Sequence, residues 1–113
     1  MKNKYVYIAG PYTNPDPVKN THRVIVMANW LREFGFVPFV PHLTLFWHFI
    51  LPHEIDYWYS YDIEWLKKCD CILRLSGESS GADKEVEIAK ELGIPIFYDP
   101  QELIWESSTP TIS

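Results

Sequence analysis

The fold is decided by residues 70–98, which read DCILRLSGESSGADKEVEIAKELGIPIFY. Two apolar runs flank a helical pattern here, and we expect a strand, a Gly/Ser turn, a helix and a second strand at 70–75, 76–81, 81–92 and 94–98. Gly93 should close the helix as its C-cap. Because strands joined by a helix pair in parallel through a right-handed crossover, this stretch predicts an α/β sheet.

The N-terminal part of the chain follows the same order. Residues 4–9 (KYVYIA) and 36–40 are β-branched, aromatic and apolar, and we expect both to be strands. A helix between them should begin after Asp16-Pro17, an N-cap followed by a first-turn proline, and should end before Gly35. The first strand runs into a glycine and a proline, as expected for a loop that faces a ligand.

Residues 42–53 are aromatic, bounded by prolines and without clean periodicity, which predicts an irregular active-site loop or lid before a helix at 54–68. Strands that alternate with helices indicate one Rossmann-like or flavodoxin-like three-layer sandwich with a parallel sheet. The predicted domain covers residues 1–106. Residues 107–113 are small and polar, and form either a frayed tail or an arm over a neighbouring subunit.

Composition excludes several classes of function. The chain has 113 residues, enough for one domain, and its formal net charge of -5 comes with no basic run, so a nucleic-acid polymer is an unexpected partner. No stretch approaches the roughly 20 apolar residues of a membrane span, so no membrane partner is expected either. The start of the sequence lacks a signal-peptide pattern, and we expect a cytoplasmic protein.

Two carboxylates occur where their helices should be apolar. Projected at about 100° per residue, Asp62 and Glu85 both fall inside the apolar arcs of their helices. An unpaired carboxylate is expensive to bury, so two of them beside the crevice at the carboxyl ends of the strands indicate an active site. The alternative is that each carboxylate pairs with Arg23, Arg32, Arg74 or a backbone amide and only orders the core.

The environments of the two carboxylates suggest different roles. We place Glu85 in the first turn of its helix, where the helix dipole would keep it ionised and nucleophilic. Asp62 lies among Trp58, Tyr59 and Trp65 and is expected to have a raised pKa that suits proton donation. One nucleophile and one acid is the division used in glycosidic chemistry.

Neither the cysteines nor the histidines indicate a metal. Cys69 and Cys71 are one residue apart in an apolar run and are interpreted as buried small hydrophobes. His42, His48 and His53 match no familiar ligand spacing, so we expect no metal and no cofactor.

Three motifs resemble one known family. They are YIAGP at 7–11, DIEWLKKCD at 62–70 and SSGADKE at 79–85, and the chain is similar to the nucleoside 2-deoxyribosyltransferase superfamily, which includes deoxynucleoside 5′-monophosphate N-glycosidases. The resemblance implies that Glu85 attacks C1′ of the sugar, that Asp62 assists departure of the base, and that Tyr7 orients the glutamate. Without the resemblance, Tyr7 would be interpreted as a buried strand aromatic.

The resemblance also implies a set of substrate-binding residues: Gly10, Pro11, His42, Trp47, Ser79 and Gly81. The first loop and Ser79 would hold the 5′ end of the sugar, while His42 bonds the base and Trp47 or Phe46 stacks on it. Phosphate-cleaving relatives carry an arginine after the first-loop glycine, whereas this chain has Pro11.

The expected partner is a small nucleoside or nucleotide, and relatives imply a homo-oligomer. Transfer and hydrolysis differ only in whether a second base or water intercepts the glycosyl-enzyme, and the sequence does not separate them. A non-catalytic nucleotide sensor is an alternative from another class. A purely structural oligomer is disfavoured, because an interface gains nothing from an unpaired buried carboxylate.

Overall fold

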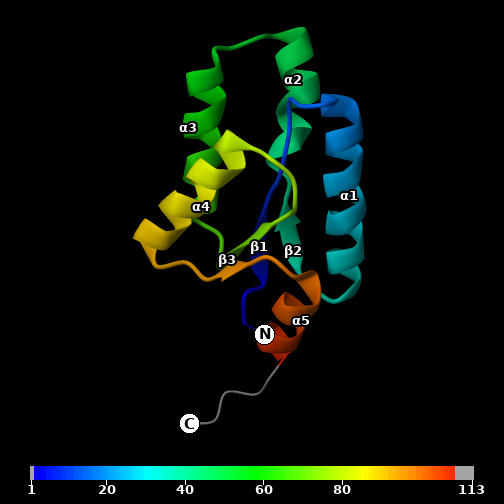
Figure 1. The fold of residues 1–113 in the computed structure, drawn as a ribbon, viewed down its shortest axis with the longest axis vertical. Helices are drawn as coiled ribbons and strands as arrows, with labels where there is room; N and C mark the ends of the chain where they lie inside the picture. The colour runs from blue at the N-terminus through cyan, green and yellow to red at the C-terminus, as the bar shows by residue number, and fades with distance from the viewer. Residues whose placement is uncertain (1, 109–113) are drawn as a thin grey trace.

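A computed structural model of the chain describes residues 2–108. Its centre is a four-stranded parallel sheet with the strand order β2-β1-β3-β4 (Figure 1). The strands are β1 (Tyr5–Ala9), β2 (Val37–Phe39), β3 (Cys71–Arg74) and β4 (Ile96–Phe97). The predicted α/β fold with a parallel sheet is therefore confirmed.

Helices cover both faces of this sheet. One face packs against α1 (Pro17–Glu33) and α5 (Pro100–Ser108), through a core that includes Ile8, Leu31 and Leu103. The other face packs against α3 (Ile55–Leu66) and α4 (Ser80–Leu92). The three layers place the residues of each strand alternately against one helix pair and the other.

The predicted helix caps are present. Asp16 accepts hydrogen bonds from the amides of Val18 and Lys19 at the start of α1, and Pro17 occupies its first turn. Gly93 closes α4 with a φ of 73°, in the left-handed region that favours glycine. The boundaries of these elements therefore follow from local sequence.

The prediction of an irregular loop at 42–53 was wrong. The segment contains a short 3-10 helix, η1 (Pro41–Leu43), and a helix, α2 (Thr44–Ile50). Its aromatic residues include Trp47, whose ring packs edge-on against those of Trp58 and Tyr61 in α3. These contacts with α3 stabilise α2. The sequence of α2 therefore shows no regular alternation of apolar and polar faces, which is the pattern used to predict helices.

The sequence analysis also missed α5. Asp99 accepts a hydrogen bond from the amide of Gln101 just before Pro100, the same Asp-Pro start as in α1. The helix continues through Ser107, which is buried, and Ser108, both of which were assigned to a polar tail. The remainder of that predicted tail, 109–113, lies outside the described residues.

The topological switch point of the sheet lies between β1 and β3, the position where open α/β sheets bind ligands. From these neighbouring strands the chain crosses to opposite edges of the sheet, to β2 after β1 and to β4 after β3. The loops that follow β1 and β3 come close together, because a Cβ added to Gly77 would lie 2.8 Å from Cγ of Pro11. No helix in residues 2–108 is long and apolar enough to cross a membrane.

This close approach predicts different effects for two glycine substitutions. Gly77→Ala and Gly93→Ala both force alanine into a positive φ. The strain at Gly93, with a φ of 73°, costs about 1–2 kcal/mol, whereas the φ of 120° at Gly77 lies outside the left-handed well and is less favourable still. Only Gly77→Ala also collides with the first loop, since nothing lies within 4 Å of a Cβ at Gly93. Urea unfolding should therefore show a greater loss of stability for Gly77→Ala, and an equal loss would contradict the close packing of these loops.

Candidate active site

Tyr7, Asp62 and Glu85 interact with one another, although they come from three elements. Tyr7 is in the middle of β1, fully buried on the face that packs against α3 and α4. Its hydroxyl donates a hydrogen bond to Oε2 of Glu85 on α4. Burial, followed by the nearby charges of Glu85 and Asp62, raises the pKa of Tyr7 well above its ordinary value, so the phenol remains a donor.

Glu85 carries two opposing influences. Burial raises its pKa to about 7, while the hydrogen bond from Tyr7 and the positive charge of Arg74 act to lower it. The prediction that Glu85 lies in the first helical turn was wrong, because Ser79 caps α4 and the helix begins at Ser80, which leaves Glu85 in the second turn. Tyr7 and Arg74 therefore replace the helix terminus as the groups that favour the ionised form.

Asp62 faces the same region from α3. Its Oδ1 is buried and has no hydrogen-bond partner among the described residues. Burial, and next the charge of Glu85, raise its pKa to about 8. Near neutral pH the two carboxyl groups can hold one proton between them, with Asp62 protonated and Glu85 ionised. This arrangement places one ionised carboxylate and one carboxylic acid in the same region.

The two facing loops hold four of the predicted substrate-binding residues. Gly10 and Pro11 are buried after β1, and a Cβ at Gly10 would touch Leu75 at 3.4 Å. Ser79 is half-buried and its Oγ accepts the amide of Ala82, so its structural role as a helix cap is clear. Gly81 is exposed at the start of α4.

His42 anchors the first loop. Its ring is buried, with Nε2 2.9 Å from the carbonyl oxygen of Pro11, which accepts the hydrogen bond. Burial lowers the pKa of His42, and its buried Nδ1 has no partner among the described residues. The ring is therefore neutral and is oriented by the loop backbone.

Trp47 belongs to an aromatic cluster formed by α2 and α3. Its ring contacts those of His53, Trp58 and Tyr61 with centroid distances of 5.1–6.5 Å. Phe46, which was predicted as the alternative to Trp47 for stacking on the base, is 72% exposed. Both Trp47 and Phe46 therefore lie on α2, in the hairpin that α2 forms with α3.

The sequence analysis missed an aromatic pair, Phe39 and Trp65, that adjoins Tyr7. Phe39 lies opposite Tyr7 in the β1–β2 register, with ring centroids 5.5 Å apart, and stacks on Trp65 at 5.4 Å. Trp65 lies one helical turn after Asp62 and is partly exposed. The signal was available, because a parallel register of the two predicted strands places Phe39 beside Tyr7.

The cysteines and histidines build no metal centre within residues 2–108, where no group of three or more His, Cys, Asp or Glu is arranged to hold an ion. Cys69 and Cys71 are free thiols, and burial raises their pKa values to about 11 and about 12. Both are therefore protonated at neutral pH and unreactive.

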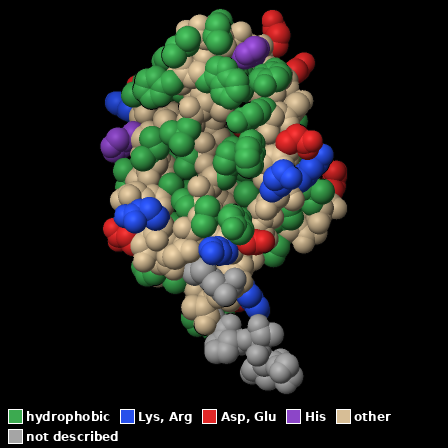
Figure 2. All heavy atoms as spheres, turned by 180° about the vertical axis from the view of Figure 1, so that it is seen from behind, with side chains coloured by type: hydrophobic (Ala, Val, Ile, Leu, Met, Phe, Trp, Pro, Cys, Tyr) green, Lys and Arg blue, Asp and Glu red, His purple; other side chains and the backbone are tan. Residues whose placement is uncertain are grey.

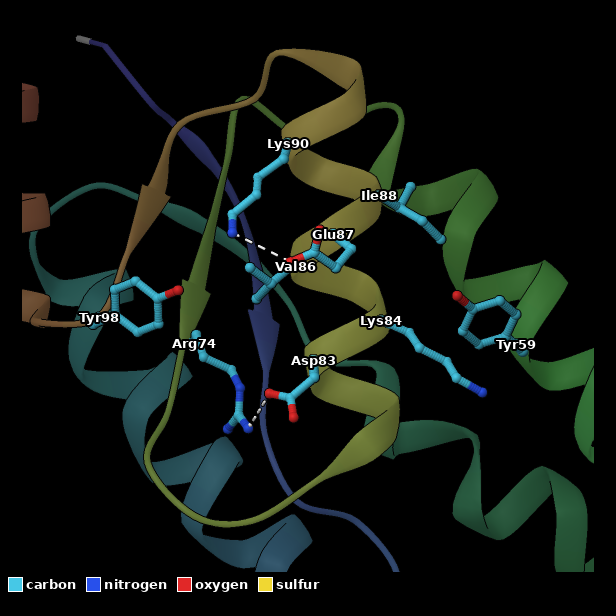
Figure 3. Close-up of a pocket in the computed structure, with 9 residues that line it drawn as sticks. All are labelled: Tyr59, Arg74, Asp83, Lys84, Val86, Glu87, Ile88, Lys90 and Tyr98. Carbon is cyan, nitrogen blue, oxygen red and sulfur yellow. Dashed lines mark hydrogen bonds and ion pairs between the residues drawn. The ribbon is translucent and has the colours of Figure 1, made fainter.

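A separate groove of about 580 Å³ follows the outer side of α4 (Figure 3). Its charged side chains are largely paired, Arg74 with Asp83 at 3.0 Å and Lys90 with Glu87 at 3.2 Å. Tyr7, Asp62 and Glu85 do not line it. The half-buried carboxyl pair, and not this groove, is the candidate active site.

Solved structures with the same fold include two 2-deoxyribosyltransferases. The enzyme from Bacillus psychrosaccharolyticus, described as a biocatalyst for nucleoside synthesis, is 19% identical with a TM-score of 0.62, over 96% of this chain and 85% of that chain. The enzyme from Leishmania mexicana is 20% identical with a TM-score of 0.63, over 82% of this chain and 61% of that chain. At these identities the likeness establishes the α/β architecture.

The family is given by a sequence profile. A profile described as a domain of unknown function, DUF7768, matches residues 4–99, and the chain belongs to this family. No curated protein matches the chain.

The buried carboxyl groups predict how stability depends on pH. Asp62 and Glu85 have folded-state pKa values of about 8 and about 7, above their ordinary values of 3.8 and 4.5. The folded state therefore binds more protons than the unfolded state in this interval, and the free energy of unfolding should fall as pH rises from about 4 to about 8. Asp62→Asn removes one such group, so its Tm should exceed that of the native chain at pH 9 and differ little at pH 4.

Calorimetry at both pH values measures this effect. Asp56→Asn on the exposed start of α3 is the matched control and should show no such gain at pH 9. A Tm of Asp62→Asn that is no higher than the native value at pH 9 would contradict the burial of an unpaired carboxyl.

Proposed function

We propose that this protein cleaves or transfers the N-glycosidic bond of a 2′-deoxynucleoside through a covalent glycosyl-enzyme on Glu85. The observation that carries the proposal is the group formed by the buried Tyr7 and the half-buried Glu85 and Asp62, next to the switch point of the sheet. The 2-deoxyribosyltransferases of the same fold support the choice of nucleosides as the substrate class.

In the first step, Oε of ionised Glu85 attacks C1′ while the bond between C1′ and the base nitrogen breaks. The departing base takes the electron pair of that bond and the proton of Asp62. Tyr7 holds Glu85 by its hydroxyl and sets which oxygen is free to attack. Glu85 ends as a glycosyl ester and Asp62 as a carboxylate.

In the second step, an acceptor base or water loses a proton to Asp62 and attacks C1′, which releases Glu85 as a carboxylate. A base as acceptor gives a deoxyribosyltransferase, and water gives a hydrolase. Phe39 and Trp65 provide flat apolar surface near Tyr7 and Asp62, and we assign them, ahead of His42 and Trp47, to packing against the base.

A preference for the 5′-monophosphate is the second candidate, favoured by Arg23. This α1 side chain reaches the loop between β3 and α4. There its guanidinium donates to the carbonyl of Ser76 at 2.7 Å and to Ser76 Oγ at 2.9 Å. An exposed cation beside Gly77 and Pro11 can attract a phosphate although Pro11 replaces the first-loop arginine.

Glu85→Gln tests the nucleophile. The amide keeps the shape of the carboxylate but cannot attack, so kcat/KM should fall by about 10³-fold or more while the fold is retained. The assay uses deoxynucleosides and their monophosphates, each with and without a free acceptor base. Glu87→Gln, on the same helix but exposed and paired with Lys90, is the control and should retain activity.

Several outcomes are informative. Near-native turnover by Glu85→Gln would overturn the nucleophile assignment. If the native chain cleaves no compound in the panel but binds nucleotides tightly, the non-catalytic sensor takes the place of the enzyme. The comparison of each nucleoside with its monophosphate decides the role of Arg23.

We also propose a homo-oligomer formed through the hairpin of α2 and α3. Exposed apolar side chains concentrate there, and Figure 2 shows hydrophobic groups gathered at this end of the molecule. They include Phe46, Phe49, Ile50, Leu51 and Ile55, which are 62–80% exposed. A second copy of the chain is the occupant that would cover this surface, since a symmetric dimer buries the same apolar patch on both subunits.

Phe49→Glu together with Ile50→Glu should convert the oligomer to a monomer, because charges cannot be buried at such a contact. Light scattering at micromolar concentration measures the mass. Val26→Glu, at an exposed apolar position of α1, should leave the assembly unchanged. A native chain that is monomeric and fully active would refute the oligomer.

A further inference from the structure

Arg74 is a buried cation on the same side of the sheet as Tyr7. It is the last residue of β3, pairs in register with Ala9, and lies two residues after Ile72, whose side chain packs beneath α3 and α4. Its side chain is only 9% exposed. A guanidinium at this depth requires partners, because an unpaired buried charge is strongly unfavourable.

Those partners join two parts of the site. The guanidinium donates to the carbonyl oxygens of Leu75 and of Gly77, the latter at 2.9 Å, and to Oδ1 of Asp83 at 3.0 Å. Figure 3 shows the side chain extending from β3 towards Asp83 on α4. A single planar group therefore fixes the loop after β3 and the beginning of the helix that carries Glu85.

The charge of Arg74 also acts on Glu85. Besides burial, the groups that shift the pKa of Glu85 are Tyr7 from β1 and Arg74 from β3. From α3, Asp62 and Tyr59 face Glu85, whose charge raises the pKa of each. Arg74 favours the ionised form of Glu85, together with the Tyr7 hydroxyl and against the effect of burial. Asp83, the acidic partner of Arg74, is 71% exposed, so water weakens its hold on the positive charge.

We propose that Arg74 is a positioning residue for Glu85: its hydrogen bonds hold the β3–α4 loop and the start of α4 so that Glu85 meets Tyr7, and its positive charge favours the carboxylate form of Glu85. The inference rests on the proposed function for its catalytic meaning. Its structural content, a link between Arg74 and the ionisation of Glu85, is independent of turnover. Arg74 touches no reacting atom in this scheme.

The test is a carboxyl ¹³C titration of Glu85 by NMR in the native chain, Arg74→Met and Arg74→Lys. Methionine fills the buried volume without charge, so the proton affinity of Glu85 should rise about tenfold. Lysine keeps the charge and should leave this affinity near the native value. Lys90→Met is the matched control, since it removes an exposed cation from α4, the helix that carries Glu85, and should leave the Glu85 titration unchanged.

Lysine separates charge from positioning, because one ammonium cannot satisfy all the acceptors of the guanidinium. Amide exchange at 77–82 should therefore be faster in Arg74→Lys than in the native chain. An unchanged Glu85 titration in Arg74→Met overturns the proposal. If Arg74→Met does not fold, native exchange rates at 77–82 in Arg74→Lys overturn it. The titration requires no substrate, so failure of the proposed function, seen as full activity of Glu85→Gln, is distinguished from failure here.

Discussion

The hydrogen bond from Tyr7 to Glu85 connects the centre of the sheet to the helix that covers it. Tyr7 is fully buried in β1, so its hydroxyl requires an acceptor, and Glu85 supplies one from α4. The remainder of the site is arranged around this contact. Asp62 approaches from α3, and Arg74 holds the loop that leads into α4.

Such an arrangement opposes stability and favours chemistry. Burial makes the ionised forms of Asp62 and Glu85 unfavourable, and each carboxyl therefore titrates near neutral pH. A fold without these groups would be more stable at alkaline pH, but it would lack the nucleophile and the acid that the proposed mechanism requires. The proposed glycosidic chemistry would explain why α3 and α4 each carry a carboxyl group in a half-buried position.

The sequence predicted the parts of the fold that depend on local signals. The Asp16-Pro17 start, the Gly93 cap and the alternation of strands and helices all follow from short-range chemistry. The helix α2 escaped prediction because its stability comes from contacts with α3, which periodicity does not report. By contrast, α5 repeats the Asp-Pro signal of α1 and could have been found.

For the site, the apolar arcs of two helices were enough to single out Asp62 and Glu85. What the sequence could not provide was the three-dimensional surroundings that set their ionisation. Because α4 begins at Ser80, Glu85 lies one turn further from the helix terminus than predicted. Of the arginines that the sequence offered as possible partners, Arg74 is the one whose charge acts on Glu85. The aromatic neighbours of the site also depend on tertiary structure, since Phe39 lies beside Tyr7 only because β1 and β2 pair in this register.

The most direct measurement of the central claim is covalent trapping. A 2′-deoxy-2′-fluoro nucleoside slows both steps and allows the glycosyl-enzyme to accumulate when the leaving base is a good one. Intact mass spectrometry followed by peptide mapping should show one fluorosugar added to the native chain, attached at Glu85. A sugar on any other residue, or no adduct from a protein that turns over the parent nucleoside, would contradict the account.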